Sequence, residues 1–319
     1  MEYTVIDTTP YLTDEAKAYL EHNQCGVRHC VLEELSERQF CSEIVGVHGV
    51  LASGEWWNRT VLEVGAASDL KIAARTGVGF DHIDVQSAAE LGIWVTNTPV
   101  ANSHAVADFT VGLILCLLRH IPKLVENVKH GKWDRLRGLE FGSMTLGVIG
   151  TGGIGREVIK RARGFGAKIL GYDVAPDENF AREFQMKYVS LEKLLSESDI
   201  VSLHCPLSDQ TRHLINQESL GLMKNTSYLV NTARPAVVDK QALVESLRTG
   251  DIAGAAIDVH DPMPVAPDDP LLSLENAIVT PWDAFSTEES IERMCITAAK
   301  DIVAVLSGET PKHPVNKPL

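Results

Sequence analysis

Six residues that directly follow an apolar run have the types and spacing of a phosphate-binding turn. Positions 150–155 read Gly-Thr-Gly-Gly-Ile-Gly and follow the run 145–149 in this chain of 319 residues. In a strand–turn–helix unit, the first glycine permits a tight turn, the second lets a pyrophosphate approach the backbone, and the third lets helix and strand pack closely. The helix expected over 156–165 would direct its N-terminus at the phosphates. The cofactor-binding residues predicted here are Gly150, Gly152, Gly153, Ile154 and Gly155.

A carboxylate at the end of the next apolar run indicates which dinucleotide would bind. Asp173 lies 18 residues after Gly155 (173 − 155) and directly follows the run 168–172. A carboxylate at this place accepts hydrogen bonds from the adenosine ribose hydroxyls and repels a 2′-phosphate. The sequence therefore predicts NAD as the cofactor, in preference to NADP.

Composition restricts the classes of partner. Hydrophobic residues make up 45% of the chain and charged residues 23%, as in soluble globular proteins. The formal net charge of −14 argues against nucleic acid or an anionic membrane, because both require basic surface. The N-terminus lacks the pattern of a signal peptide, and no uncharged apolar stretch reaches the roughly 18 residues of a membrane span. We therefore expect a cytoplasmic protein with a small-molecule substrate.

The six cysteines are scattered along the chain, without a CxxC pair or a tight cluster with histidine. They are Cys25, Cys30, Cys41, Cys116, Cys205 and Cys295. This distribution is typical of reduced thiols, and it predicts no metal site.

Apolar runs that alternate with helical patterns predict an α/β fold. We expect two doubly wound parallel-sheet domains, Rossmann-like or flavodoxin-like, with a deep interdomain cleft. Because the glycine turn lies mid-chain, an NAD-binding Rossmann domain of residues 101–284 would be inserted into a discontinuous substrate-binding (catalytic) domain of residues 1–100 and 285–319. The expected strands are 4–6, 45–51, 70–74, 93–96, 147–149, 168–171, 200–203, 228–231, 255–257 and 277–279.

Two longer helical patterns complete this organisation. The stretch 103–128 is mostly apolar and contains Pro122, which would kink or break a helix. A second pattern, 287–306, would cross back to the first domain. Within the first pattern, residues 109–118 suit either a dimer interface or a core helix.

Five segments, in order along the chain, resemble motifs of the D-isomer-specific 2-hydroxyacid dehydrogenase family, which includes 3-phosphoglycerate, glycerate and formate dehydrogenases. The segments are 75–84, 96–108, 202–216, 230–234 and 255–259. The resemblance covers nearly the whole chain. It implies that backbone N–H groups of the first segment bind the substrate carboxylate. The third segment would lie on the adenine side of the cofactor, and the last two on the nicotinamide side.

The resemblance also assigns roles to individual residues. Those implied to contact substrate are Gly77, Val78 and Gly79, with Ser53 and Trp57 in the loop that borders the substrate. Trp57 and its neighbour Trp56 have an equally plain alternative as packing or dimer-contact residues. The further cofactor-binding residues are Cys205, Pro206, Thr211, Thr232, Ala233 and Asp258.

The family's chemistry uses an arginine, a glutamate and a histidine. Arg234 matches the arginine, whose permanently charged, bidentate guanidinium suits the substrate's carboxylate and carbonyl. The glycine that usually follows is Pro235, which restricts Arg234 to an extended backbone.

Both members of the proton-handling pair are replaced. Trp282 stands where the family has its acid–base histidine, in Thr-Pro-Trp, and Met263 stands where the supporting glutamate is found. A glutamate without its imidazole would be a buried charge with no partner, and a contact between methionine sulfur and the indole is a consistent replacement. An indole cannot exchange a proton near neutral pH, so the ordinary family mechanism is not expected.

Three functions remain open. In the first, hydride transfer persists and Asp283, His260 or Asp261 handles the proton, since each neighbours the lost pair in sequence. In the second, bound NAD serves a non-redox or lyase-type reaction in a more apolar pocket. In the third, the chain is a non-catalytic NAD(H)-sensing protein.

Two further expectations concern substrate and assembly. Positions 52–54 read Ala-Ser-Gly where phosphoglycerate-type members have Arg-Ser-x, so a phosphate-binding arginine is absent. Family members are usually homodimers joined through their cofactor domains, and the resemblance implies the same here.

Overall fold

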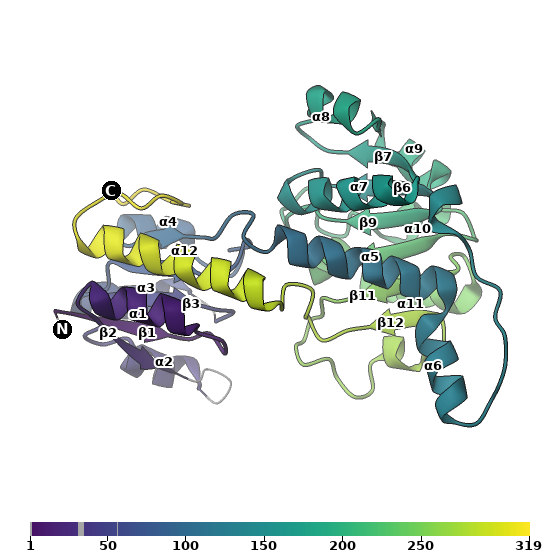
Figure 1. Ribbon diagram of the computed structural model, residues 1–319. Coiled ribbons are helices and arrows are strands. Elements are labelled where there is room, and N and C mark those ends of the chain that lie inside the picture. The colour runs from purple at the N-terminus through teal and green to yellow at the C-terminus, as the bar shows by residue number, and fades with distance from the viewer. Residues whose placement is uncertain (1, 31–34, 56) are drawn as a thin grey trace. The chain divides into compact units, whose positions relative to one another are not determined.

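The computed structural model describes residues 2–30, 35–55 and 57–319 (Figure 1). The chain divides into two compact units. Unit 1 comprises Met1–Asn102 and Ser286–Leu319, and unit 2 comprises Ser103–Phe285. Within the described residues, no single helix is long and apolar enough to cross a membrane. The helices Ser103–Arg119 and Ile121–Lys129 are long and apolar enough only when taken together, and the chain bends by 64° between them.

Unit 1 is built on a parallel sheet of five strands in the order β2-β1-β3-β4-β5. Helix α12 returns from the end of the chain and packs beside α1 on this sheet (Figure 1), burying Ala298, Ala299 and Ile302 against Val5 and Ile72. The elements of unit 1 are β1 (Tyr3–Asp7), α1 (Asp14–His22), β2 (Cys25–His29), α2 (Glu37–Glu43), β3 (Gly49–Ala52), α3 (Arg59–Ser68), β4 (Ile72–Arg75), α4 (Val85–Glu90), β5 (Trp94–Thr96) and α12 (Glu288–Leu306).

Unit 2 is built on a parallel sheet of seven strands in the order β12-β11-β10-β9-β6-β7-β8. Its elements are α5 (Ser103–Arg119), α6 (Ile121–Lys129), β6 (Thr145–Ile149), α7 (Gly153–Phe165), β7 (Lys168–Tyr172), α8 (Glu178–Glu183), β8 (Lys187–Tyr188), α9 (Leu191–Glu197), β9 (Ile200–Leu203), α10 (Gln217–Leu222), β10 (Tyr228–Asn231), α11 (Lys240–Thr249), β11 (Gly254–Ile257) and β12 (Ala277–Val279), with short 3-10 helices at Phe141–Ser143, Pro235–Val237 and Pro270–Ser273. The predicted α/β class with two parallel, Rossmann-like sheets is confirmed.

Most predicted strands match the structure closely, and the errors have local causes. The strand predicted over 45–51 begins only at Gly49, because α2 ends next to Ile44 and a turn follows. Two strands were not predicted, β2 and β8. Strand β2 ends in Arg28 and His29, and β8 has only two residues, so neither contains an apolar run.

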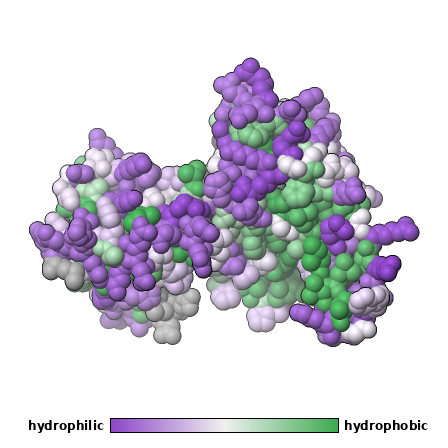
Figure 2. Space-filling view, viewed as in Figure 1, coloured by the Kyte–Doolittle hydropathy of each residue, from purple (hydrophilic) through white to green (hydrophobic). Residues whose placement is uncertain are grey.

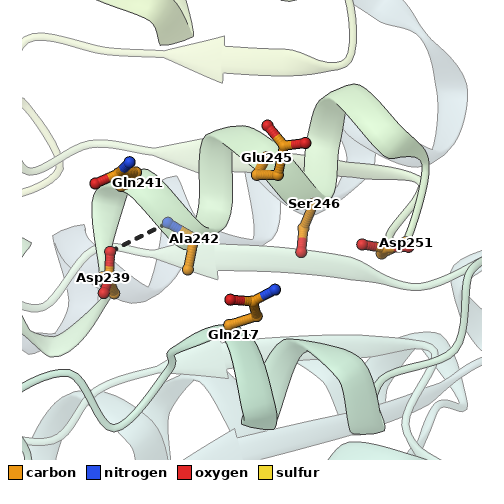
Figure 3. Close-up of a pocket in the computed structure, with 7 residues that line it drawn as sticks. All are labelled: Gln217, Asp239, Gln241, Ala242, Glu245, Ser246 and Asp251. Atoms are coloured by element: carbon orange, nitrogen blue, oxygen red, sulfur yellow. Dashed lines mark hydrogen bonds between the residues drawn. The ribbon is translucent and has the colours of Figure 1, made fainter.

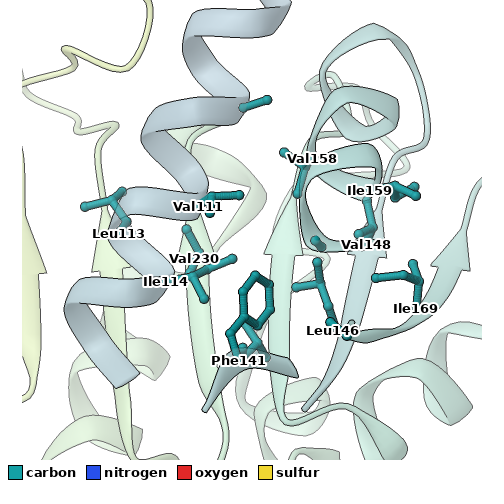
Figure 4. Packing of buried hydrophobic residues seen from close by; sticks show 14 of the residues in the cluster. Val111, Leu113, Ile114, Phe141, Leu146, Val148, Val158, Ile159, Ile169 and Val230 are labelled. Atoms are coloured by element: carbon teal, nitrogen blue, oxygen red, sulfur yellow. The ribbon is translucent and has the colours of Figure 1, made fainter. Parts of the chain in front are cut away.

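Helix α5 is a core helix of unit 2 (Figure 4). Ala107, Val111, Ile114 and Leu118 lie in one buried cluster with apolar residues of β6 and α7. This burial favours the core-helix alternative for residues 109–118, and a dimer contact through this helix stays a prediction. The predicted break is present, with His120 in a left-handed conformation between α5 and α6. Pro122 occupies the first turn of α6, where a missing N–H costs nothing.

Candidate functional site

The glycine turn of unit 2 has the shape that a dinucleotide requires. Gly150 has φ +89°, and a Cβ at this position would lie 2.5 Å from the Cys205 backbone nitrogen. A Cβ on Gly155 would lie 2.0 Å from the Gly150 carbonyl oxygen, so the third glycine permits the close packing of helix on turn. A Cβ on Gly152 would meet nothing within 4 Å. The open space is therefore at the second glycine, where a pyrophosphate approaches.

Helix α7 starts inside this motif, three residues earlier than predicted. Gly152 is its N-cap and forms no side-chain capping bond. The first-turn N–H groups, which include those of Gly153 and Ile154, are thus left for an anionic group at the positive end of the helix. Together with the open space at Gly152, this arrangement fits the phosphates of a dinucleotide.

Asp173 lies at the end of β7 and also holds the glycine turn. Its Oδ2 accepts hydrogen bonds from the Thr151 N–H (2.6 Å) and hydroxyl (3.0 Å). Its Oδ1 accepts the Ala175 N–H at 2.9 Å and keeps a second lone pair for a ribose hydroxyl. The Arg156 Nε donates to the Thr151 carbonyl at 3.1 Å. Sequence reasoning missed Thr151 and Arg156, because their contacts are made only when the turn is folded.

The predicted adenine-side residues form the segment after β9. Cys205 is buried against Gly150, and burial raises the pKa of its thiol to about 11, so it stays protonated. Thr211 donates to the Pro206 carbonyl at 2.6 Å and accepts the Ser208 N–H at 2.8 Å, which closes a compact turn. Burial also lowers the pKa of His204 to about 3, so its imidazole is neutral beside the glycine turn.

Arg234 is presented by a turn at the end of β10. The Asn231 carboxamide accepts the Ala233 N–H at 3.0 Å and donates to the Arg234 carbonyl at 2.9 Å. Asn231 is buried and was not singled out from the sequence. The backbone of Arg234 is extended (φ −141°, ψ 144°) before Pro235, as predicted. Thr232, the other predicted residue of this turn, has its hydroxyl 3.0 Å from that of Thr110.

The Arg234 guanidinium lies over the indole of Trp282, with its central carbon 5.8 Å from the ring centroid. The guanidinium also donates to the Ala233 carbonyl at 2.8 Å. These contacts hold a permanent positive charge against an aromatic wall. Met263 is 62% exposed, so the buried methionine–tryptophan contact expected from the sequence is not what the structure shows.

Asp258 positions the segment that carries Trp282. Its carboxylate is fully buried and accepts the Thr280 hydroxyl at 2.6 Å and the N–H groups of Asp283 and Ala284 at 3.0 Å each. Asp258 therefore has a positioning role within the domain. Among the described residues, its Oδ2 accepts only the Ala284 N–H and keeps a lone pair, and its expected contact with the cofactor stays a prediction.

The three residues suggested for proton transfer lie in different surroundings. His260 is buried and its Nε2 donates to the Thr280 carbonyl at 2.8 Å, so it also supports the 280–284 segment. Asp261 and Asp283 are exposed. Of these two aspartates, Asp283 is the closer in sequence to Trp282, which it directly follows.

The backbone of the 77–79 loop in unit 1 is suited to binding a carboxylate. Its carbonyl oxygens already accept hydrogen bonds: that of Gly77 from the Thr98 N–H at 3.0 Å, and that of Val78 from the Asn97 side-chain amide at 2.7 Å. Gly79 accepts Arg75 Nε at 3.1 Å. Among the residues that the structure describes, the N–H groups of Val78 and Gly79 have no acceptor. Two adjacent free N–H groups suit a carboxylate.

The loop after β3 differs from its predicted role. Trp57 is fully buried, packs edge-to-face on Phe40 (centroids 5.3 Å apart) and belongs to the core of unit 1. It is a packing residue and not part of a substrate wall. Trp56 lies outside the described residues. The Ser53 N–H is bonded within the loop, to Thr8 Oγ1 at 3.0 Å and Glu55 Oε2 at 2.9 Å.

A hollow of 360 Å³ lies between α10 and α11 (Figure 3). It is lined by Gln217, Asp239, Gln241, Ala242, Glu245, Ser246 and Asp251. None of these was predicted to bind substrate or cofactor. The candidate site is therefore formed by residues at the carboxyl ends of strands and not by this hollow.

Fold and glycine turn together define a dehydrogenase-type NAD-binding protein, and comparison with known proteins gives the family. Residues 111–284 match the family described as "D-isomer specific 2-hydroxyacid dehydrogenase, NAD binding domain". The chain is 44% identical to a glyoxylate reductase of Korarchaeum cryptofilum over 79% of this chain and 78% of that protein. The chain belongs to the D-isomer-specific 2-hydroxyacid dehydrogenase family, and its cofactor is NAD.

Solved structures agree with this assignment. A protein of Thermus thermophilus superposes with a TM-score of 0.89 at 35% identity, covering 98% of this chain and 99% of that one. The D-lactate dehydrogenase of Aquifex aeolicus, complexed with NAD and lactic acid, superposes with a TM-score of 0.86 at 29% identity, covering 99% of this chain and 100% of that one. The chain is thus a dehydrogenase-like enzyme, as the sequence motifs predicted.

Proposed function

We propose that this enzyme interconverts a small 2-oxo acid and its 2-hydroxy acid with NAD, and that it transfers the proton without the family's histidine–glutamate pair. The observation that carries the proposal is Arg234, whose guanidinium is fixed between the Ala233 carbonyl and the Trp282 indole. A carboxylate substrate would bind this guanidinium through two parallel hydrogen bonds. NAD, when bound, supplies hydride transfer to or from the substrate carbon.

Each remaining residue has a limited task in this proposal. The free N–H groups of Val78 and Gly79 would bind carboxylate oxygens, as the family resemblance implies. Trp282 would exclude water and stiffen Arg234, and Asp283 would carry the proton from the neighbouring position. Asp258 would keep Trp282 and Asp283 in place through its bonds to the 280–284 backbone.

A titration with NADH followed by an absorbance assay tests this function. We expect NADH to bind and to be consumed when glyoxylate or pyruvate is added, because both present a carboxylate next to a carbonyl. Binding of NADH without turnover of any 2-oxo acid would contradict the proposal. That result would favour a non-redox or lyase-type NAD enzyme, or an NAD(H)-sensing protein.

The double variant Trp282→His with Met263→Glu should recover the family mechanism. We expect its kcat with a 2-oxo acid to rise by about a hundredfold, which is the lower end of the usual contribution of a positioned acid–base group. The variant should also show a pH profile with a pKa near that of histidine. Steady-state assays across pH test this, with Trp282→His alone as the control. An unchanged kcat in the double variant would mean that more than the proton-handling pair has changed.

We infer that unit 2 forms a homodimer through α6 and the segment after it. Helix α6 has no buried residue, and Figure 2 shows apolar side chains gathered in its region. The exposed apolar residues are Ile121, Val125, Val128, Trp133, Leu136 and Leu139, with Trp133 80% exposed. A contiguous apolar surface of this kind marks a protein interface more often than a solvated face.

Glutamate at Val125 and Trp133 together should convert a dimer to a monomer, because two charges would have to be buried in an apolar contact. Sedimentation equilibrium measures the change in mass. Val45→Glu, at another exposed valine in unit 1, is the control and should leave the mass unchanged. A wild-type protein that sediments as a monomer would contradict the inferred dimer.

The cysteines support a proposed cytoplasmic location. All six are free thiols. Burial raises the pKa of Cys295 to about 12, so this thiol stays protonated and unreactive. Free thiols of this kind are typical of a reducing compartment.

A further inference from the structure

Glu55 occupies a special place in the sheet of unit 1. The strand order β2-β1-β3-β4-β5 places the ends of β1 and β3 side by side at the point where the strand order reverses, and such points bind ligands in open α/β sheets. Glu55 lies in the segment that follows β3. The 75–84 segment, which contains the substrate loop, is joined to it through Thr76 N–H to the Ala52 carbonyl at 2.9 Å and Trp57 N–H to the His82 carbonyl at 3.1 Å.

The carboxyl group of Glu55 is the centre of this segment's hydrogen bonding. Its Oε1 lies 2.8 Å from Thr8 Oγ1 and accepts the Trp57 indole N–H at 3.0 Å. Its Oε2 accepts the Ser53 N–H at 2.9 Å. The group therefore connects Thr8, at the end of β1, to both Ser53 and Trp57.

The contacts of Thr8 indicate where a proton lies. Thr8 Oγ1 is 2.9 Å from the Leu51 carbonyl and 2.8 Å from Glu55 Oε1, and both are acceptors if Glu55 is ionised. One hydroxyl proton cannot serve both fully. With a proton on Glu55, Thr8 donates to Leu51 while Glu55 donates to Thr8, so each of these two contacts has its own hydrogen. The Ser53 N–H, 3.0 Å from Thr8 Oγ1 and 2.9 Å from Glu55 Oε2, is shared between the two oxygens in either state.

We propose that Glu55 carries a proton in the folded protein and that, as a neutral carboxyl group, it is a positioning residue for Ser53 and Trp57, which lie beside the substrate loop. The part concerning substrate rests on the proposed function, whereas the protonation state does not. Desolvation raises the pKa of Glu55, in agreement with this state. It outweighs the lowering of the pKa by the backbone hydrogen bond, by the contacts with Thr8 and Trp57, and by the charge of Arg75.

The charged and titratable groups around Glu55 come from several elements. The charge of Arg75, at the end of β4, lowers the pKa of Glu55. Cys30, after β2, interacts electrostatically with both Glu55 and Asp7, which lies at the end of β1. His82 contacts the Ser53 carbonyl at 3.1 Å through Nε2. A Glu55→Gln variant keeps all four groups, so any pH response that it loses belongs to Glu55.

The first test does not require turnover. The Trp57 indole donates directly to Glu55, so ionisation of Glu55 should change the fluorescence of Trp57. We expect a pH-dependent fluorescence step in the wild type above the ordinary range of glutamate, and no such step in Glu55→Gln. An infrared difference spectrum should show a protonated carboxyl band that the variant lacks. A wild type without the step and without the band would overturn the proposal.

Thr8→Val gives an independent test. If neutral Glu55 donates to Thr8, removing this acceptor shifts the infrared band of the protonated carboxyl group. If Glu55 is ionised, neither protein has such a band, which would contradict the proposal even where Glu55→Gln does not fold.

The positioning role is tested by kinetics. In the wild type, KM for glyoxylate should rise at high pH as Glu55 ionises and the segment loosens, whereas Glu55→Gln should have a KM that does not follow this step. Glu55→Ala should raise KM about tenfold at every pH, with kcat less affected, since it removes hydrogen bonds of the segment. If no 2-oxo acid is turned over at all, the proposed function fails while the fluorescence and infrared results still decide the state of Glu55. A wild-type KM that is flat across the fluorescence step would refute the positioning role alone.

Discussion

Replacement of Arg234 by alanine should lower kcat/KM for a 2-oxo acid by about a thousandfold, or roughly 4 kcal/mol of transition-state stabilisation. The guanidinium is held at one place by the Ala233 carbonyl and the Trp282 ring, so its loss removes a preorganised partner for the substrate's charge. The affinity for NADH should hardly change, because the glycine turn and Asp173 are unaffected. Steady-state kinetics and an NADH titration measure the two effects separately.

Two further variants make this result specific. Arg234→Lys keeps the charge but loses the planar pair of donors, so it should recover only part of the activity. Arg248→Ala removes an exposed arginine from the last turn of α11 and should leave kcat/KM unchanged. A normal kcat/KM in Arg234→Ala would exclude Arg234 from substrate binding.

Gly155→Ala should destabilise unit 2 by about 3 kcal/mol, at the upper end of the usual cost of overpacking. Its Cβ would lie 2.0 Å from the Gly150 carbonyl oxygen, and this backbone atom cannot move without distorting the phosphate-binding turn. Thermal or denaturant unfolding measures the change. Gly164→Ala, in the same helix with nothing within 4 Å of its Cβ, should be neutral or slightly stabilising. Equal stability of the two variants would contradict the close packing at Gly155.

Gly152→Ala separates folding from cofactor binding at the same motif. Its Cβ meets no protein atom within 4 Å, so unfolding should be close to that of the wild type. The methyl group would nevertheless occupy the space through which the pyrophosphate approaches, and NADH affinity should fall by about tenfold or more. Unchanged NADH affinity in this variant would mean that the dinucleotide does not lie at Gly152.

Much of the fold could be read from the sequence, because its main strands carry their own pattern. The inner strands Ile200–Leu203 and Tyr228–Asn231 were predicted residue by residue. Parallel strands that are covered on both faces are continuous apolar runs, so each is visible in isolation. The strands β2 and β8 escaped prediction because β2 ends in Arg28 and His29 and β8 has only two residues, so neither contains an apolar run.

The candidate site also has features that the sequence reveals and features that it does not. The glycine turn and Asp173 are local in sequence, and with the other motifs they led directly to NAD and to the family. The replacement of the acid–base pair by Trp282 and Met263 was likewise predicted from short motifs. The neighbours of a side chain are not local. No pattern along the chain indicated that Arg234 would lie on Trp282, that Met263 would be exposed, or that Asp258 would hold a backbone segment.

The sequence by itself determined the cofactor and the fold class and predicted the replacement of the usual proton donor, because each depends on residue types at short spacing. Only the tertiary structure decided which polar groups share a hydrogen-bond network. Glu55 is the clearest case: Thr8 lies 47 residues away along the chain, and only the pairing of β1 with β3 brings the two together. Burial then raises the pKa of Glu55, because desolvation depends on everything packed around a group and not on its neighbours in sequence.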